Sequence, residues 1–181
     1  MSKKIIALAA LAVLSSTAMA ASAADGTGFY GGVVIGSTQF KDEGGSENKT
    51  SFGAQLGYNF NANFAVEVQA QRLGKWSEDG FSLTANSANV SALGKLPVAD
   101  NISVFVRAGY SRNTLKATEG NASGSIHKNK ALVGVGADFK VASNISLRTE
   151  YVNFGKTTIG EGSDSVSIKM QQVNVGVNHA F

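Results

Sequence analysis

The chain has 181 residues, of which 43% are hydrophobic and 16% charged, with 21 glycines, one proline and no cysteine. The lack of cysteine excludes both a disulfide framework and thiolate chemistry. The formal net charge is +3, and it falls to +1 without the two lysines of the N-terminal segment, so the charge balance favours no nucleic-acid partner.

The N-terminal segment has the pattern of a secretory signal peptide. Two lysines precede an apolar run over residues 5–14, and the small-residue motifs AMA and ASA follow. We predict a signal peptide over residues 1–20, with cleavage after Ala20 or Ala23, and one domain over residues 24–181. No later apolar run approaches the roughly 18 residues of a membrane helix, which excludes a helical membrane protein.

After the signal, apolar residues recur with a period of two. In SFGAQLGYNF, for example, the apolar residues occupy one parity, while glycine, glutamine and asparagine occupy the other. Such alternation predicts β-strands with two different faces. In chain order, the eight alternating segments are residues 29–40, 51–60, 64–71, 87–96, 101–110, 131–139, 145–154 and 168–181.

The connections between these segments differ at the two ends of the predicted sheet. Short turns rich in Asn, Asp and Ser recur around Asn63, Asn101 and Asn144, which are turn-forming compositions. The other connections are longer and polar, and we expect them to be loops: residues 41–50, 74–80, 112–129 and 154–167. The pattern predicts an all-β fold, an eight-stranded up-and-down antiparallel barrel, because closure removes exposed strand edges.

The composition of the two parities indicates which face is outside. A soluble barrel would turn its apolar parity inward around a ligand, whereas a transmembrane barrel turns it toward lipid. The apolar parity is nearly free of charge, and the polar parity is mostly small and amide residues that suit a narrow lumen. We therefore predict a transmembrane barrel, although alternation alone also permits the soluble one.

The polar parity also carries charges, which we expect to pair inside the lumen. Three are acids and three are bases, so each charge has an available opposite partner. An unpaired charge in such an interior is strongly disfavoured. The alternative is a set of solvated surface charges. The six residues are Glu67, Lys95, Arg107, Asp138, Arg148 and Glu150.

The sequence resembles the eight-stranded transmembrane domain of the outer membrane protein A (OmpA) family. GFYGGVVIGSTQF resembles the opening strand of that domain, and QLGYNFNANFAVEVQAQRLG, LGKLPVADNISVFVRAGYS and ADFKVASNISLRTEYVNFG resemble its three periplasmic hairpins. The resemblance implies that Glu67, Arg107, Asp138, Arg148 and Glu150 belong to a lumenal charge network. Lys95 lies two residues from the lumenal lysine of the family, where this chain has Leu93.

The resemblance also implies a function and a location. It indicates a barrel-only member, without the periplasmic peptidoglycan-binding domain, in the outer membrane of a Gram-negative bacterium. The expected role is structural, with long loops available for adhesion or other surface contact, and the alternative is a small porin-like channel. Expected partners are outer-membrane lipids and lipopolysaccharide, the barrel assembly machinery, and host or surface ligands of the loops.

The C-terminal stretch VNVGVNHAF has an apolar alternation that ends in an aromatic residue. It predicts the closing strand, and it resembles the tag by which barrel precursors are recognised for membrane insertion. His179 stands where that pattern more often has an apolar or aromatic residue. The residues of this signal are Val173, Val175, Val177 and Phe181.

Candidates for chemistry are few, and we expect neither an enzyme nor a cofactor. His127 has Ser123, Ser125 and Glu119 as sequence neighbours, which is a hydrolase composition, but the segment is a polar Gly/Ser/Asn-rich stretch that offers no rigid support. Three acids of the first long connection are candidates for a divalent cation at lipopolysaccharide, although no ligand spacing fits a defined site. They are Asp42, Glu43 and Glu47.

Overall fold

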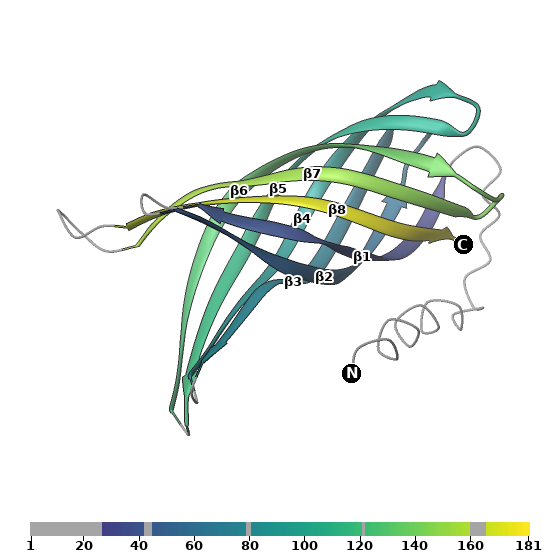
Figure 1. Ribbon diagram of the computed structural model, residues 1–181. Coiled ribbons are helices and arrows are strands. Elements are labelled where there is room, and N and C mark those ends of the chain that lie inside the picture. Colours follow the sequence, from purple (N-terminus) through teal and green to yellow (C-terminus); the bar gives the residue numbers. More distant parts are fainter. Residues whose placement is uncertain (1–26, 42–44, 79–80, 121, 160–165) are drawn as a thin grey trace.

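The computed structural model describes residues 27–41, 45–78, 81–120, 122–159 and 166–181, and it confirms the predicted fold class. Eight antiparallel strands pair in sequence order and close into a barrel (Figure 1). No helix in these ranges is long and apolar enough to cross a membrane. The predicted signal peptide and its cleavage sites lie outside the described residues. The strands are β1 (Gly28–Lys41), β2 (Ser46–Asn59), β3 (Phe64–Glu78), β4 (Phe81–Ala99), β5 (Ile102–Glu119), β6 (Ala122–Lys140), β7 (Ile145–Ile159) and β8 (Val166–Ala180).

The alternating faces of the strands lie as the sequence pattern predicts. On β5, Val104 and Val106 point outward and are 40% and 61% exposed, whereas Phe105 and Arg107 between and beside them are buried in the lumen. Aromatic rings form a row on the outside near one end, with ring centroids 4.8 Å apart for Phe29–Tyr58. The outer face is therefore an apolar belt with an aromatic margin, which suits a bilayer.

The three predicted short turns lie together at one end of the barrel, which we call the turn end. In the first, the Phe60 amide donates to the Phe64 carbonyl at 2.9 Å. In the third, Val141 donates to Ile145 at 3.0 Å. The start of β1 and the end of β8 also meet here, in a register that pairs Tyr30 with Ala180. The last strand is thus the closing strand, as predicted.

The prediction of long loops at the opposite end, which we call the hairpin end, was wrong for much of its length. Residues 112–129 are almost entirely strand, since β5 runs to Glu119 and β6 begins at Ala122. β3 likewise runs to Glu78, and β4 begins at Phe81. Strands that extend beyond a bilayer meet water on both faces. Polar residues can then occupy both faces, so the apolar/polar alternation is lost although the backbone hydrogen bonds between the strands continue.

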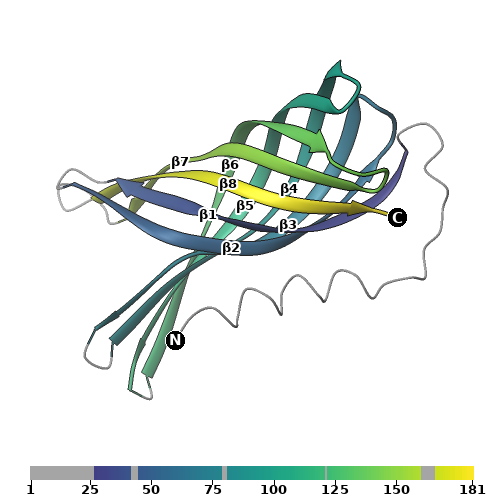
Figure 2. The same cartoon turned by 45° about the vertical axis from the view of Figure 1, so that its right-hand side comes forward.

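The hairpin end of the barrel is divided into two halves. Pairing between β2 and β3 stops at Phe52–Arg72, and pairing between β6 and β7 stops at Val133–Asn153. By contrast, β4 and β5 and also β5 and β6 stay paired to the hairpin tips. Figure 2 shows the β3–β4 and β5–β6 hairpins projecting away from the ends of β1, β2, β7 and β8. We call the two places where pairing stops the β2–β3 seam and the β6–β7 seam.

The apolar belt predicts a steep penalty for charge on the outer face. Val106→Arg places a cation in the middle of the belt, and we expect it to lower the free energy of unfolding by about 2–4 kcal/mol. Thr118→Arg is the matched control, because Thr118 has the same orientation on β5 but lies near the hairpin tip. Denaturant titration of both variants in lipid vesicles measures the difference. Equal stability of the two would contradict a lipid-facing belt.

Candidate functional site

The lumen near the turn end is crossed by ion pairs centred on Glu67 of β3. Its carboxylate accepts a hydrogen bond from Arg107 Nη2 of β5 at 2.5 Å and one from Arg148 Nη1 of β7 at 2.6 Å. The Tyr30 hydroxyl of β1 donates to the same carboxylate at 2.7 Å. Glu67 is fully buried, so these three charge-assisted bonds replace its lost hydration.

Each arginine also binds a second carboxylate. The Arg107 Nε donates to Glu150 Oε1 at 2.5 Å. Arg148 makes a bidentate pair with Asp138, at 2.7 Å from Nε to Oδ1 and 2.9 Å from Nη2 to Oδ2. The planar guanidinium suits this arrangement, because its fixed donors reach two carboxylates at once.

Lys95 of β4 joins the network at its edge. Its Nζ lies 3.7 Å from Asp138 Oδ2 and donates to Asn59 Oδ1 at 2.9 Å. Both Lys95 and Asp138 keep 13% of their side-chain exposure, more than the central members. Leu93, two residues before Lys95 on the same face of β4, is fully buried. The structure thus brings together all six charged residues singled out in the sequence, from five strands.

Two aromatic rings support the network, and the sequence analysis did not identify them as part of it. Arg148 stacks on the Phe105 ring at 4.7 Å and lies 5.7 Å from the Tyr30 ring. Each ring lies over a glycine of the neighbouring strand, where an added Cβ would come within 2.2 Å of Tyr30 at Gly57 and within 2.5 Å of Phe105 at Gly136. The role of these rings could be recognised only from the strand register, which places each aromatic residue directly opposite its glycine.

A layer of amide side chains lies above the charge network. A chain of hydrogen bonds crosses three strands and reaches a fourth, from Asn89 to Gln69 at 3.1 Å, from Gln69 to Gln55 at 3.1 Å and from Gln55 to Asn178 at 2.6 Å. Further toward the hairpin end, Gln172 donates to Ser51 at 2.7 Å. These residues are buried, so the amides occupy the lumen rather than lining an open channel.

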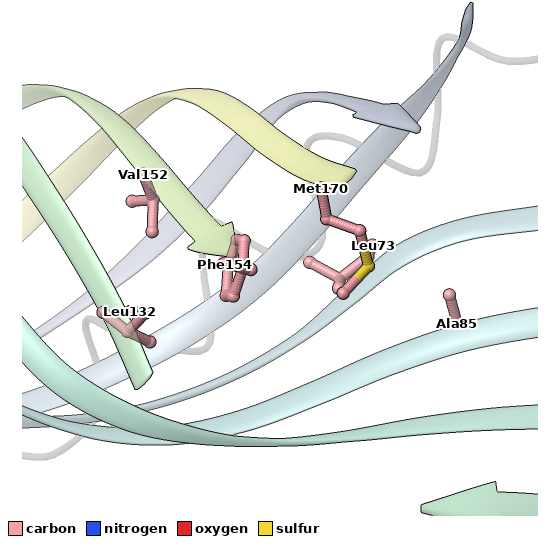
Figure 3. Packing of buried hydrophobic residues seen from close by; sticks show 6 residues of the cluster. All are labelled: Leu73, Ala85, Leu132, Val152, Phe154 and Met170. Carbon is pink, nitrogen blue, oxygen red and sulfur yellow. The ribbon is translucent and has the colours of Figure 1, made fainter. Parts of the chain in front are cut away.

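The lumen becomes apolar at the hairpin end. Figure 3 shows Leu73, Phe154 and Met170, from strands of both halves, pointing into one space, with Leu132 and Val152 to their left. Phe40, Trp76, Leu115 and Ile168 pack against this cluster. The sequence pattern does not reveal this layer, because Leu132, Val152 and Met170 are apolar residues on the otherwise polar parity of predicted strands.

The remaining residues singled out in the sequence are placed as follows. Val173, Val175 and Val177 lie on the outer face, between 43% and 55% exposed. The Phe181 amide donates to the Phe29 carbonyl at 3.0 Å, which ties the last residue to β1. His179 Nε2 lies 2.8 Å from the Asn144 side-chain amide of the third turn.

The candidates for chemistry lie at the hairpin end. His127 Nδ1 is 2.9 Å from Thr114 Oγ1, its cross-strand partner, while the register pairs Ser125 with Lys116. Glu47 is an ion-pair partner of Lys49 at 2.6 Å and accepts from the Trp76 indole at 2.5 Å. Asp42 and Glu43 lie outside the described residues.

The charge network predicts that its members depend on one another for stability. Glu67→Ala leaves Arg107 and Arg148 with one carboxylate partner each, and Arg148→Ala leaves Asp138 with only its 3.7 Å pair to Lys95. We expect each change to lower the free energy of unfolding by about 3–5 kcal/mol. Lys49→Ala, which breaks the exposed pair with Glu47, is the control and should change stability far less. Denaturation midpoints in detergent measure the effects. Unchanged midpoints for both lumen variants would exclude a packed lumen.

Comparisons with known proteins agree with this architecture. The family model described as outer membrane protein beta-barrel domain matches residues 6–181. No curated protein matches the chain by sequence. Among solved structures, Neisserial surface protein A (NspA) aligns with a TM-score of 0.70 at 17% identity, covering 84% of this chain and 97% of that one.

Two further structures share the fold at low identity. Ail, the attachment invasion locus protein of Yersinia pestis, aligns with a TM-score of 0.56 at 18% identity, over 83% of this chain and 99% of that one. The N-terminal barrel domain of Pseudomonas aeruginosa OprF aligns with a TM-score of 0.55 at 12% identity, over 83% and 97%. The eight-stranded barrel and the family match together place the protein in the bacterial outer membrane, and the chain belongs to the outer membrane protein beta-barrel domain family.

Proposed function

We propose that this protein is a closed structural and surface-contact barrel, with no catalytic activity, rather than a channel. The observation that carries the proposal is the filled lumen. Glu67, Arg107, Arg148 and Glu150 bridge the barrel wall to wall, and each is at most 3% exposed. An ion or solute would have to break several buried charge-assisted hydrogen bonds in order to pass.

The cavities of the lumen support the same conclusion against the porin-like alternative. A pocket of about 360 Å³ at the turn end is lined by Lys95, Asp138 and Arg148 among others. A separate pocket of about 590 Å³ opens at the hairpin end and is lined by Leu73, Trp76 and neighbouring residues. The two share no lining residue, and the charge and amide layers lie between them.

Planar bilayer recordings test the closed lumen. We expect no reproducible single-channel steps from the wild-type protein. A variant with both Arg107→Ser and Glu150→Ser removes both ion pairs of Arg107 and leaves two acids and two bases in the network. We expect this variant to conduct. Regular conductance steps from the wild type would favour the porin-like channel and refute the closed barrel.

The projecting hairpins support a role in surface contact. Short turns face the periplasm in barrels of this kind, so the hairpin end faces outward from the cell. On β3 and β5, Lys75 and Lys116 each pair with Thr84 of the strand between them, and all three lie in one row. Arg72 lies in the next row and Arg112 in the row after it, and all four bases are exposed.

We assign this basic face to binding of anionic glycans, with the sugar phosphates of lipopolysaccharide as one source. Neighbouring strands are about 4.8 Å apart, so Lys75 and Lys116, on either side of β4, lie about 10 Å apart and can contact one polyanion. One structure with the same fold, Ail, was solved in complex with the heparin analogue sucrose octasulfate. That likeness supports the chemistry proposed here, and the cross-strand basic row is the feature of this chain on which it depends.

Binding of heparin to the protein in phospholipid nanodiscs tests the basic face. The double change Lys75→Ser and Lys116→Ser should weaken binding about tenfold and reduce its salt dependence, because two charge contacts are lost. Lys140→Ser removes an exposed cation at the turn end and should leave binding unchanged. An equal loss of heparin affinity in both variants would show that binding depends on net charge alone, and it would refute a defined glycan surface.

The C-terminal strand supports a further part of the proposal, that the barrel assembly machinery recognises this end of the chain. Val173, Val175 and Val177 offer an outward apolar row, and Phe181 follows them at the turn end. The row belongs to the closing strand, so it would be free until β1 and β8 pair.

A further inference from the structure

The hairpin end of the lumen holds an apolar pocket that the structural role does not require. Its volume is about 590 Å³, within the roughly 300–1,000 Å³ of small-molecule sites. Side chains of both halves line it. Among them are Phe40 of β1 and Met170 of β8 from one half, and Trp76 of β3, Leu83 of β4 and Leu115 of β5 from the other. A surface-contact barrel gains nothing from an unfilled apolar concavity in water, since exposed apolar surface is unfavourable.

The pocket has a closed floor. Leu73 and Phe154 are fully buried, and Leu132 is 1% exposed. Beneath them, Gln71 and Gln172 exchange hydrogen bonds at 3.1 and 3.2 Å. An occupant therefore meets a buried apolar cluster and then a layer of hydrogen-bonded amides, so the pocket is a terminal binding site and not the entrance of a pathway.

The two seams give the pocket its shape. Beyond Phe52–Arg72 and Val133–Asn153, the strands of the two halves are no longer paired, so the pocket is a cleft between two sheets and not a round hole. Phe40 and Trp76 bound one side of it, because their rings are in edge-to-face contact across the halves with centroids 4.9 Å apart. A narrow apolar cleft of this form accepts an unbranched chain better than a bulky ring system.

The rim of the pocket carries a charge suited to one end of such a ligand. Lys128 lines the pocket and is exposed, and it makes no ion pair with any residue that the structure describes. The other charged lining residue, Glu47, is held by Lys49 and by the Trp76 indole. An apolar cavity with an exposed cation in its lining is complementary to an amphiphile with an anionic headgroup.

We propose that the pocket binds a single-chain anionic amphiphile of the fatty-acid class from the medium. Its alkyl chain lies in the cleft between Trp76, Leu115 and Met170, and its carboxylate lies at Lys128.

Trp76 provides a direct readout, because it is the one tryptophan of the sequence and it lines the pocket. The full-length protein in phospholipid nanodiscs is titrated with 9,10-dibromostearate, whose bromines quench indole fluorescence on contact. We expect saturable quenching, about tenfold weaker in affinity with the methyl ester, which lacks the charge. Quenching that rises linearly without saturation would mean partition into the bilayer, and it would overturn the proposal.

Variants separate the pocket from the membrane. Combined Leu115→Asn and Ile126→Asn should weaken stearate binding about tenfold, since two apolar lining residues become polar. The control is Thr118→Asn, which lies on the opposite face of β5, outside the pocket lining, and should leave binding unchanged. Lys128→Ala should weaken binding of the acid but not of the ester. Equal affinity for stearate in the wild type and the Leu115/Ile126 variant, or no effect of Lys128→Ala, would overturn the assignment.

A second arm identifies the source of the chain. Nanodiscs made with dibrominated phosphatidylcholine place bromine on the bilayer lipid itself. We expect Trp76 fluorescence to remain largely unquenched in these discs, in contrast to its quenching by free dibromostearate. Full quenching by the bilayer lipid alone would assign the cleft to a membrane lipid chain and overturn binding of a free amphiphile.

Discussion

The carboxylate of Glu67 is the contact on which the inner half of the barrel depends. It is the only acid of the described network that binds both arginines, and through them it connects β3 with β5, β6 and β7. A buried carboxylate needs several donors, and Glu67 receives them from Arg107, Arg148 and Tyr30. The aromatic rings and their facing glycines then follow as requirements of packing, because the guanidinium groups need flat apolar surfaces beside them.

The lumen therefore changes character along its axis. Charges fill the turn end, amides fill the middle, and apolar side chains line the hairpin end. In the same direction the wall changes from a closed ring of paired strands to two separate sheets. The inner part is crossed by ion pairs and hydrogen bonds, so it suits a structural role, while the outer part is open and carries the surfaces proposed to bind other molecules.

Most of the fold was predictable because a membrane imposes a strict rule. Where one face meets lipid and the other a narrow lumen, residues alternate, and Val104–Arg107 on β5 display this pattern plainly. The six lumen charges were visible for the same reason. Beyond the bilayer both faces meet water, so the outer parts of β5 and β6 lack the alternation and their sequence predicts loops. The pairing of Tyr30 with Gly57 was also hidden, because it depends on register between strands and not on spacing within one.

The two seams also create an aggregation hazard, because they leave four strand edges with unpaired backbone groups among the described residues. Free edges invite pairing with the strands of other molecules, and proteins commonly protect them with lysine. Each edge here has one: Lys49 on β2, Lys75 on β3, Lys130 on β6 and Lys156 on β7. In a crowded membrane, these four lysines oppose edge-to-edge association of neighbouring barrels, so the mouth can stay open without becoming a template for aggregation.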